Sequence, residues 1–239
     1  MSLQNDGGAK TRAKEKERLV LSWLYQWGFS TRRLLSQLLG VSVAGQGAFY
    51  SRLLAAGVIT EQPLPLSQNE KLIGLSKSGA GLAASYGVLG RYKRNPPTLG
   101  MLAHELTLQR AVISRLDDAS SATPEWMNAS GGKGKNCDAI IQYPNYAIAL
   151  EVELSHKNNV RIYYNYLSHL RNIRAGLYKK VVYVFTDETL RSLYERKFRA
   201  AEWPVVVSDD RHRLKVRPDT FRLGEENWPL IEFVLGEEY

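Results

Sequence analysis

Apolar residues in the first part of the chain recur at the three- and four-residue spacing of helices. A helix is predicted over residues 14–27, because Trp23, Leu24 and Trp27 share one face and Gly28 can end it. Residues 1–13 are polar and are predicted to be a flexible tail. The same spacing and its punctuating glycines predict helices over residues 30–39, 45–56 and 79–86, with a short strand over residues 71–75.

Three short helices followed by a β-ribbon are the order of a winged helix, a helix-turn-helix domain predicted here over residues 14–90. The third helix of such a domain lies in the major groove of DNA. Side chains that are polar, basic or aromatic in and near the second and third helices are therefore predicted DNA contacts: Arg32, Arg33, Gln46, Tyr50 and Arg52. The alternative is a small helical domain used for dimerisation.

Residues 91–97 read Arg-Tyr-Lys-Arg-Asn-Pro-Pro and break the helical pattern. Two prolines prevent a helix from continuing through them. We predict a basic linker between two domains, with Lys93 and Arg94 available to backbone phosphates.

Residues 98–239 alternate between helical and strand patterns and are predicted to form the second domain. Strands of four to eight apolar residues stand between amphipathic helices, which favours an α/β arrangement with a central mixed sheet. The chain as a whole is predicted to be an α+β protein. The predicted helices cover residues 98–116, 159–174 and 187–201, and the predicted strands cover residues 126–128, 137–143, 147–154, 181–185 and 203–207.

The net charge of +8 narrows the choice of partner, since a basic protein suits a polyanion. Nucleic acid is favoured over an anionic membrane surface, because no apolar run approaches the roughly 20 residues that cross a bilayer. The N-terminus lacks the apolar segment of a signal peptide, so a cytoplasmic location is predicted. The one cysteine, Cys137, provides neither an internal disulfide nor a zinc site.

Acidic residues stand inside two of the predicted apolar strands. Glu151 and Glu153 are two residues apart and face the same way, and a hairpin brings Asp138 alongside them. Carboxylates packed together in a core are unfavourable unless a cation neutralises them. Three oxygen donors at one sheet edge predict a site for a hard cation, Mg²⁺ or Mn²⁺. The alternative is a solvated edge strand whose carboxylates pair with lysines.

Lysines close to these carboxylates complete a pattern that suits phosphodiester cleavage. Lys157 follows the second acidic strand, and Lys133 and Lys135 precede Asp138. A metal ion polarises the phosphate and activates water, and a lysine stabilises the developing charge. We predict Asp138, Glu151 and Glu153 as metal ligands, with the three lysines contacting DNA or the reacting phosphate.

The order helix, three strands, helix, strand resembles the PD-(D/E)xK restriction-endonuclease superfamily. Asp138 stands at the first acidic position of that motif, after Cys137 where proline is usual, and Glu151 stands at the second. Glu153 occupies the position of the motif's lysine, which leaves Lys157 as a displaced candidate. The resemblance implies a metal-dependent nuclease domain.

A second resemblance uses more of the chain. The basic winged helix, His104–Glu105–Leu106, Asp138–Ala139–Ile140 and Leu150–Glu151–Val152–Glu153 look like the replication-relaxation group, which includes the MOBC-type relaxases of plasmids. The resemblance implies a relaxase that nicks one strand of a plasmid transfer origin to begin conjugation. It also implies His104 as a site residue, and as partners double- and single-stranded DNA, a relaxosome accessory protein and a coupling ATPase.

Two other interpretations stay open. The domain could be a restriction-type or repair endonuclease, or the protein could be a non-catalytic DNA-binding factor of plasmid replication or of the relaxosome. A covalent tyrosine mechanism is disfavoured, because Tyr163, Tyr164 and Tyr166 belong to a predicted helix in which aromatic side chains pack.

Overall fold

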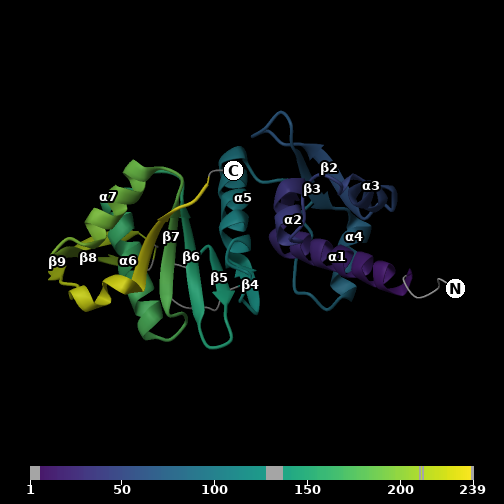
Figure 1. Ribbon diagram of the computed structural model, residues 1–239. Helices are drawn as coiled ribbons and strands as arrows, with labels where there is room; N and C mark the ends of the chain where they lie inside the picture. Colours follow the sequence, from purple (N-terminus) through teal and green to yellow (C-terminus); the bar gives the residue numbers. More distant parts are fainter. Residues whose placement is uncertain (1–5, 128–136, 210, 212, 238–239) are drawn as a thin grey trace. The chain divides into compact units, whose positions relative to one another are not determined.

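The computed structural model describes residues 6–127, 137–209, 211 and 213–237 (Figure 1). The chain forms two compact units, Met1–Gln109 and Arg110–Tyr239. The division falls within helix α5 (Leu99–Ile113), whereas the sequence pattern placed the second domain from residue 98. The positions of the two units relative to each other are not determined, so each is described by itself.

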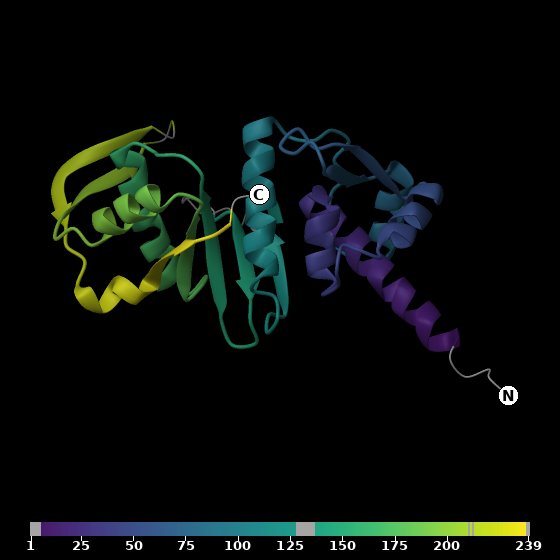
Figure 2. The same cartoon turned by 45° about the horizontal axis from the view of Figure 1, so that its top comes forward.

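The N-terminal unit has the helix and strand order of a winged helix (Figure 2). Its three strands form an antiparallel sheet of order β1-β3-β2, in which β2 and β3 make the wing. Its elements before α5 are α1 (Asp6–Trp27), β1 (Phe29–Thr31), α2 (Arg32–Leu38), α3 (Gly47–Ala55), β2 (Ile59–Pro63), β3 (Lys71–Leu75) and α4 (Lys77–Ser85).

Local signals in the sequence set most of these boundaries. Gly28 follows α1 with a φ of 89°, a backbone conformation that glycine adopts without strain. The side chains of Thr31 and Ser76 accept hydrogen bonds from the first turns of α2 and α4, as N-caps do. The first helix begins at Asp6, within the segment predicted as a tail, and the short strand β1 was not predicted.

The predicted linker belongs to the N-terminal unit. The backbone N–H of Arg91 donates to the carbonyl of Tyr25, and the Lys93 side chain lies over Gly28. The Lys93 ammonium is 3.8 Å from the Glu105 carboxylate. The prolines end the helical pattern as expected. The segment, however, packs against the N-terminal unit and does not form a free connection between two domains.

The C-terminal unit contains the predicted mixed sheet, which has five strands in the order β10-β7-β6-β5-β4. Strands β4, β5 and β6 pair antiparallel, and β6, β7 and β10 pair parallel. The strands are β4 (Ser121–Pro124), β5 (Ala139–Gln142), β6 (Ala147–Glu153), β7 (Lys180–Phe185) and β10 (Ile231–Leu235).

Helices α6 (Asn159–Arg174) and α7 (Glu188–Phe198) pack on one face of this sheet. Tyr166 of α6 is fully buried at the centre of an aromatic cluster. Its ring is within 6.5 Å, between centroids, of the rings of Tyr183, Tyr194, Phe198, Trp203 and Phe233. This cluster holds the two helices against the strands through apolar contact.

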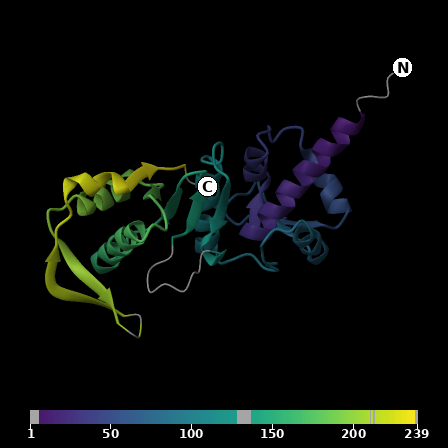
Figure 3. The ribbon, with the colours of Figure 1, turned by 90° about the horizontal axis from the view of Figure 1, so that it is seen from below.

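The final strands differ from the prediction. Residues 203–207 lie in β8 (Trp203–Ser208), which leaves the main sheet and pairs with β9 (Leu214–Phe221) as a separate hairpin beside α6 (Figure 3). The edge position next to β7 is taken by β10, after the 3₁₀ helix η2 (Glu225–Leu230). The predicted strand at residues 126–128 is also wrong, because residues 125–127 form the 3₁₀ helix η1 directly after β4.

Candidate functional site

Asp138 and the β6 glutamates gather at one end of the main sheet. Ala139 of β5 pairs with Leu150 of β6, so Asp138 precedes β5 at the end where β6 finishes. The Asp138 backbone N–H donates to the Leu150 carbonyl at 3.0 Å, and its Oδ2 accepts from the Val152 N–H at 2.8 Å. The carboxylate thus continues the β5–β6 hydrogen bonding beyond the last paired residue of β5.

Glu151 is fully buried and faces His169 on α6. Its Oε1 is 3.2 Å from His169 Nε2, and neither side chain is exposed beyond 1%. The other ring nitrogen, Nδ1, is 2.8 Å from the hydroxyl of Tyr178, which accepts a hydrogen bond from Asn172. Burial raises the pKa of Tyr178 well above its ordinary value, so this hydroxyl keeps its proton. A chain of polar groups therefore runs from β6 into the core.

Glu153 lies one step further along β6 and has a different partner. Its Oε1 is 2.5 Å from the ammonium of Lys157, and its side chain is 2% exposed. Burial, with a smaller contribution from the negative charge of Glu153, raises the pKa values of Tyr183 and Tyr194. Glu153 therefore lies at the border of the aromatic cluster. The partly exposed Lys157 side chain covers the Glu153 carboxylate.

These partners bear on the metal prediction. Lys157 brings a positive charge next to Glu153, and His169 lies next to Glu151 and is charged only if it is protonated. No three His, Cys, Asp or Glu side chains come together as a metal site among the residues that the structure describes. Mg²⁺ or Mn²⁺ at Asp138, Glu151 and Glu153 stays a prediction, and binding would require both glutamates to exchange these neighbours for the ion.

His169 is the residue that the sequence analysis missed. Its signal was present, because it falls at the buried helical spacing that Ile162 and Tyr166 define in α6. Asn165, one turn earlier on the same face, is also buried. Polar residues on the apolar face of a helix indicate buried polar contacts, and of these two it is His169 that meets the acidic strand.

Among the other predicted residues of the cleavage site, the structure places Lys157 alone relative to the carboxylates. His104 belongs to the N-terminal unit, so its place beside Asp138 stays a prediction. Lys133 and Lys135 lie outside the described residues. Lys157 is the one predicted lysine that the structure places next to an acidic position, as the displaced-lysine hypothesis requires.

Tyr166 packs instead of serving as a nucleophile. It is fully buried, and its hydroxyl donates to the Tyr194 carbonyl at 2.9 Å. Burial raises its pKa far above the ordinary value, which disfavours the phenolate that an attack would need. Tyr163 packs against Trp203, 5.9 Å between ring centroids.

Tyr50 requires a correction in the winged helix. It is fully buried, so it is a core residue and not a DNA contact. The Arg32 guanidinium lies 5.2 Å from the centre of its ring and donates to Glu61 at 2.7 Å, so Arg32 is held within the unit as well. Burial of the ring outweighs its polar hydroxyl at this position.

The remaining basic candidates are more accessible. Arg33, Arg52 and Arg94 are exposed, and Gln46 is half-buried directly before α3. Arg52 is 3.8 Å from Glu17, an exposed pair of the kind that contributes little to stability. Lys93, by contrast, is directed at Glu105 and covered on one side by its own unit.

Comparisons with known proteins leave the family open. No protein-family model and no curated protein matches the chain. Similar solved structures include ZitR of Lactococcus lactis in an apo form, with 15% identity and a TM-score of 0.29 over 34% of this chain and 61% of that chain. Another is a DNA complex of MepR from S. aureus, with 20% identity and a TM-score of 0.29 over 34% of this chain and 74% of that one.

A third similarity covers more of the present chain. Protein VC1899 from Vibrio cholerae has 14% identity and a TM-score of 0.24 over 73% of this chain and 47% of that chain. The chain spans less than two thirds of the length of ZitR and of VC1899. These TM-scores are too low to assign a fold, so the strand pairing and helix order given above define it. None of the helices described here is long and apolar enough to cross a membrane.

Proposed function

We propose that this protein binds DNA through its winged helix, with α3 as the element that enters the major groove. The observation that carries the proposal is the two-sided character of α3. Tyr50 and Leu53 bury one side in the unit, while Ser51 and Arg52 are exposed on the other, and α3 contains no acidic residue. A helix held in this way can present polar side chains to base edges and phosphates.

The surroundings of α3 support the same function. Arg33 in the first turn of α2 and Lys71 at the start of the wing strand β3 line a hollow of about 370 Å³, together with the Arg32–Glu61 pair and Glu70, so that its cations outnumber its carboxylates by three to two. Arg33 and Lys71 are both exposed. Side chains of α2 and of the wing therefore share one surface near the turn before α3, and the chain has an excess of eight positive charges. A positive surface of this type releases counterions when it meets DNA.

The test is fluorescence anisotropy with labelled duplex DNA, comparing the parent with Arg52→Ala. If Arg52 contacts a phosphate, the salt slope of log K falls by about one, and if it contacts a base edge, sequence preference relaxes. The matched control is Lys77→Ala, which removes one exposed positive charge from α4 of the same unit. Equal affinity and salt slope for the parent and Arg52→Ala would remove α3 from the interface.

A second candidate function is strand cleavage by the C-terminal unit, in its narrow form as a relaxase at a plasmid transfer origin. The chain order α5-β4-β5-β6-α6-β7 and the approach of Asp138 to the end of β6 favour it. Such a relaxase would act with an accessory protein and a coupling ATPase. The contact between Lys157 and Glu153 is also compatible with it, because the displaced-lysine hypothesis requires a lysine beside the acidic strand.

Cleavage is tested with supercoiled plasmid carrying a candidate origin, with Mg²⁺ or Mn²⁺ added. A relaxase nicks one strand at one position, and Asp138→Ala and Glu151→Ala lose the activity while keeping DNA affinity. The control Asp219→Ala removes an exposed acidic side chain of β9. Double-strand breaks at many positions would indicate a restriction-type nuclease. Binding without any cut by the parent would indicate an accessory DNA-binding protein.

A further inference from the structure

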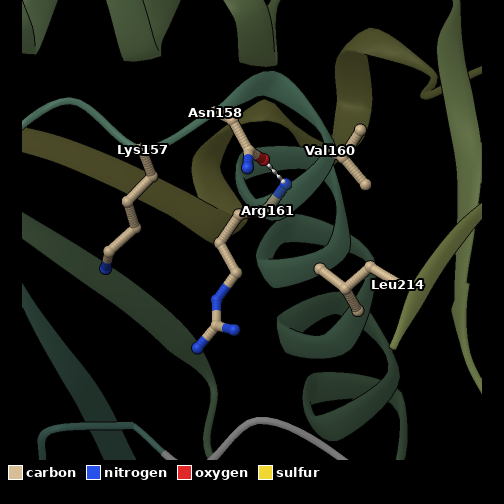
Figure 4. Close-up of a pocket in the computed structure, with 5 residues that line it drawn as sticks. All are labelled: Lys157, Asn158, Val160, Arg161 and Leu214. Carbon is tan, nitrogen blue, oxygen red and sulfur yellow. Dashed lines mark hydrogen bonds between the residues drawn. The ribbon is translucent and has the colours of Figure 1, made fainter. Parts of the chain in front are cut away.

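A second basic feature lies in the C-terminal unit, where α6 begins beside the β8–β9 hairpin. Here a pocket of about 640 Å³ is lined by Lys157, Asn158, Val160, Arg161 and Leu214 (Figure 4). The first four come from the start of α6 and the residues before it, and Leu214 comes from β9. Among the described residues, two cationic side chains and no acidic one line the pocket.

Arg161 is the strongest anion-binding group of this pocket. It is exposed, and no acidic side chain pairs with its guanidinium among residues 137–209, 211 and 213–237 of the unit. Figure 4 shows its side chain extending away from α6 on the same side as Lys157. The Lys157 ammonium is one-third exposed and partly neutralised by Glu153, so Arg161 contributes most of the available charge. Its planar guanidinium can bind a phosphate through two parallel hydrogen bonds.

The start of α6 strengthens this preference for an anion. Asn158 caps the helix by accepting from the Arg161 N–H at 2.9 Å, and the first turn of α6 has no acidic residue. The first backbone N–H groups and the helix dipole add partial positive charge there. Val160 and Leu214 give the pocket an apolar wall, which suits the sugar that adjoins a phosphate in a nucleic acid.

The hairpin extends the positive charge beyond the pocket. Arg213, Lys215 and Arg217 are exposed on and beside β9, with Arg213 and Lys215 within 3.4 Å of Asp209. With Arg211 and Asp219 included, the described residues of the hairpin carry four cationic and two acidic side chains. Because residues two apart on a strand share one face, Lys215 and Arg217 lie on the opposite face of β9 from Leu214, so the charge at the pocket itself comes from Lys157 and Arg161.

We propose that the Lys157–Arg161 pocket binds a backbone phosphate of DNA, so that the C-terminal unit contacts DNA in addition to the winged helix. This inference rests on the proposed DNA-binding function and gives it a second surface. Through Lys157 and Glu153, the bound phosphate lies next to the acidic end of β6. DNA held there would be presented to that end of the sheet whether or not the unit cuts it.

The experiment uses the full chain with a fluorescein-labelled duplex and its single strand, measured by anisotropy over a range of salt. Arg161→Ala is expected to lower the salt slope by about one for at least one of the two probes. Arg161→Lys keeps the charge and is expected to restore most of the slope. The matched control is Arg174→Ala, which removes an exposed arginine from the last turn of α6 and is expected to bind like the parent.

Each outcome separates this inference from the proposed function. If Arg52→Ala weakens binding and Arg161→Ala does not, the pocket is not a DNA site and the winged-helix function stands. If Arg161→Ala weakens binding and Arg52→Ala does not, the pocket is a DNA site and the assignment of α3 to the interface is wrong. Parent protein that binds neither probe overturns both. If inorganic phosphate raises the melting temperature of the parent but not of Arg161→Ala, while both bind DNA equally, the pocket takes free phosphate and the proposal is overturned.

Discussion

Glu151 and His169 form a buried pair that joins β6 to α6, with 3.2 Å between Oε1 and Nε2 and both side chains at most 1% exposed. The pair lies at a position where the sequence alone suggested a metal ligand. His169 is in turn tied to Tyr178 through Nδ1. The carboxylate thus has a structural role in this arrangement, whichever activity the unit has.

Replacing His169 tests that role. His169→Leu removes the imidazole that lies 3.2 Å from the buried Glu151 carboxylate and 2.8 Å from the Tyr178 hydroxyl, so the free energy of unfolding should fall by about 1–3 kcal/mol. The double variant Glu151→Leu with His169→Leu should lose less than the sum of the two single losses, because both single variants remove the same interaction. Urea denaturation of the parent, the two single variants and the double variant measures this double-mutant cycle. Additive losses would mean that the two groups do not interact.

Alanine substitutions at two glycines of α4 are expected to have opposite effects on stability. A Cβ added at Gly79 would lie 1.8 Å from the Val58 carbonyl oxygen, whereas one added at Gly81 meets nothing within 4 Å. Gly79→Ala should destabilise the N-terminal unit by about 1–3 kcal/mol or more through overpacking. Gly81→Ala should stabilise it by up to about 1 kcal/mol, because alanine favours a helix. Thermal unfolding followed by circular dichroism measures the stability of both variants. A Gly79→Ala variant as stable as the parent would mean that α4 does not lie this close to Val58.

Substitutions at Tyr50 test whether it is a core residue or a DNA contact. Tyr50→Ala should lower the free energy of unfolding by about 3–5 kcal/mol, since it removes a fully buried ring. Tyr50→Phe keeps the ring and should retain both stability and DNA affinity. Denaturation and anisotropy measure the two properties separately. A Phe variant that folds normally but loses DNA affinity would restore the hydroxyl as a DNA contact.

Glu188 gives a pH-dependent prediction at the start of α7. Hydrogen bonds from Arg191, then from Ser192, lower the pKa of its carboxyl from an ordinary 4.5 to about 2. Because the folded-state pKa is the lower one, its stabilisation is present above about pH 4.5 and is lost as the pH falls through about 2. An NMR titration of the Glu188 side chain should show this midpoint. Arg191→Ala should return the midpoint toward 4.5, and an unchanged midpoint would exclude Arg191 as the cause.

Periodic and capping signals predicted most of the individual elements. Helix α6 has the predicted bounds, and in the structure the side chains of Ser76 and Asp187 cap α4 and α7. These features are local, because a cap or an amphipathic face depends on residues a few positions apart. The mixed character of the main sheet also followed from the order of helices and strands.

Pairing between distant segments could not be derived in the same way. β8 and β10 are both apolar strands that contribute an aromatic side chain to the cluster around Tyr166, Trp203 and Phe233 respectively, yet only β10 joins the main sheet and β8 pairs with β9. The burial of Tyr50 likewise depends on what covers α3, and its residue type leaves both core and surface open.

By itself the sequence determined the helices and their caps, the order of elements, the positive charge, and the presence of acidic residues in an apolar strand. Tertiary structure alone decided what those acidic residues contact. Glu151 and Glu153 share one face of β6, because residues two apart on a strand point the same way, and their partners come from positions 18 and 4 residues further along the chain. Lys157 reaches Glu153 from the connection just before α6, whereas only the packing of α6 on β6 brings the distant His169 to the buried Glu151 carboxylate.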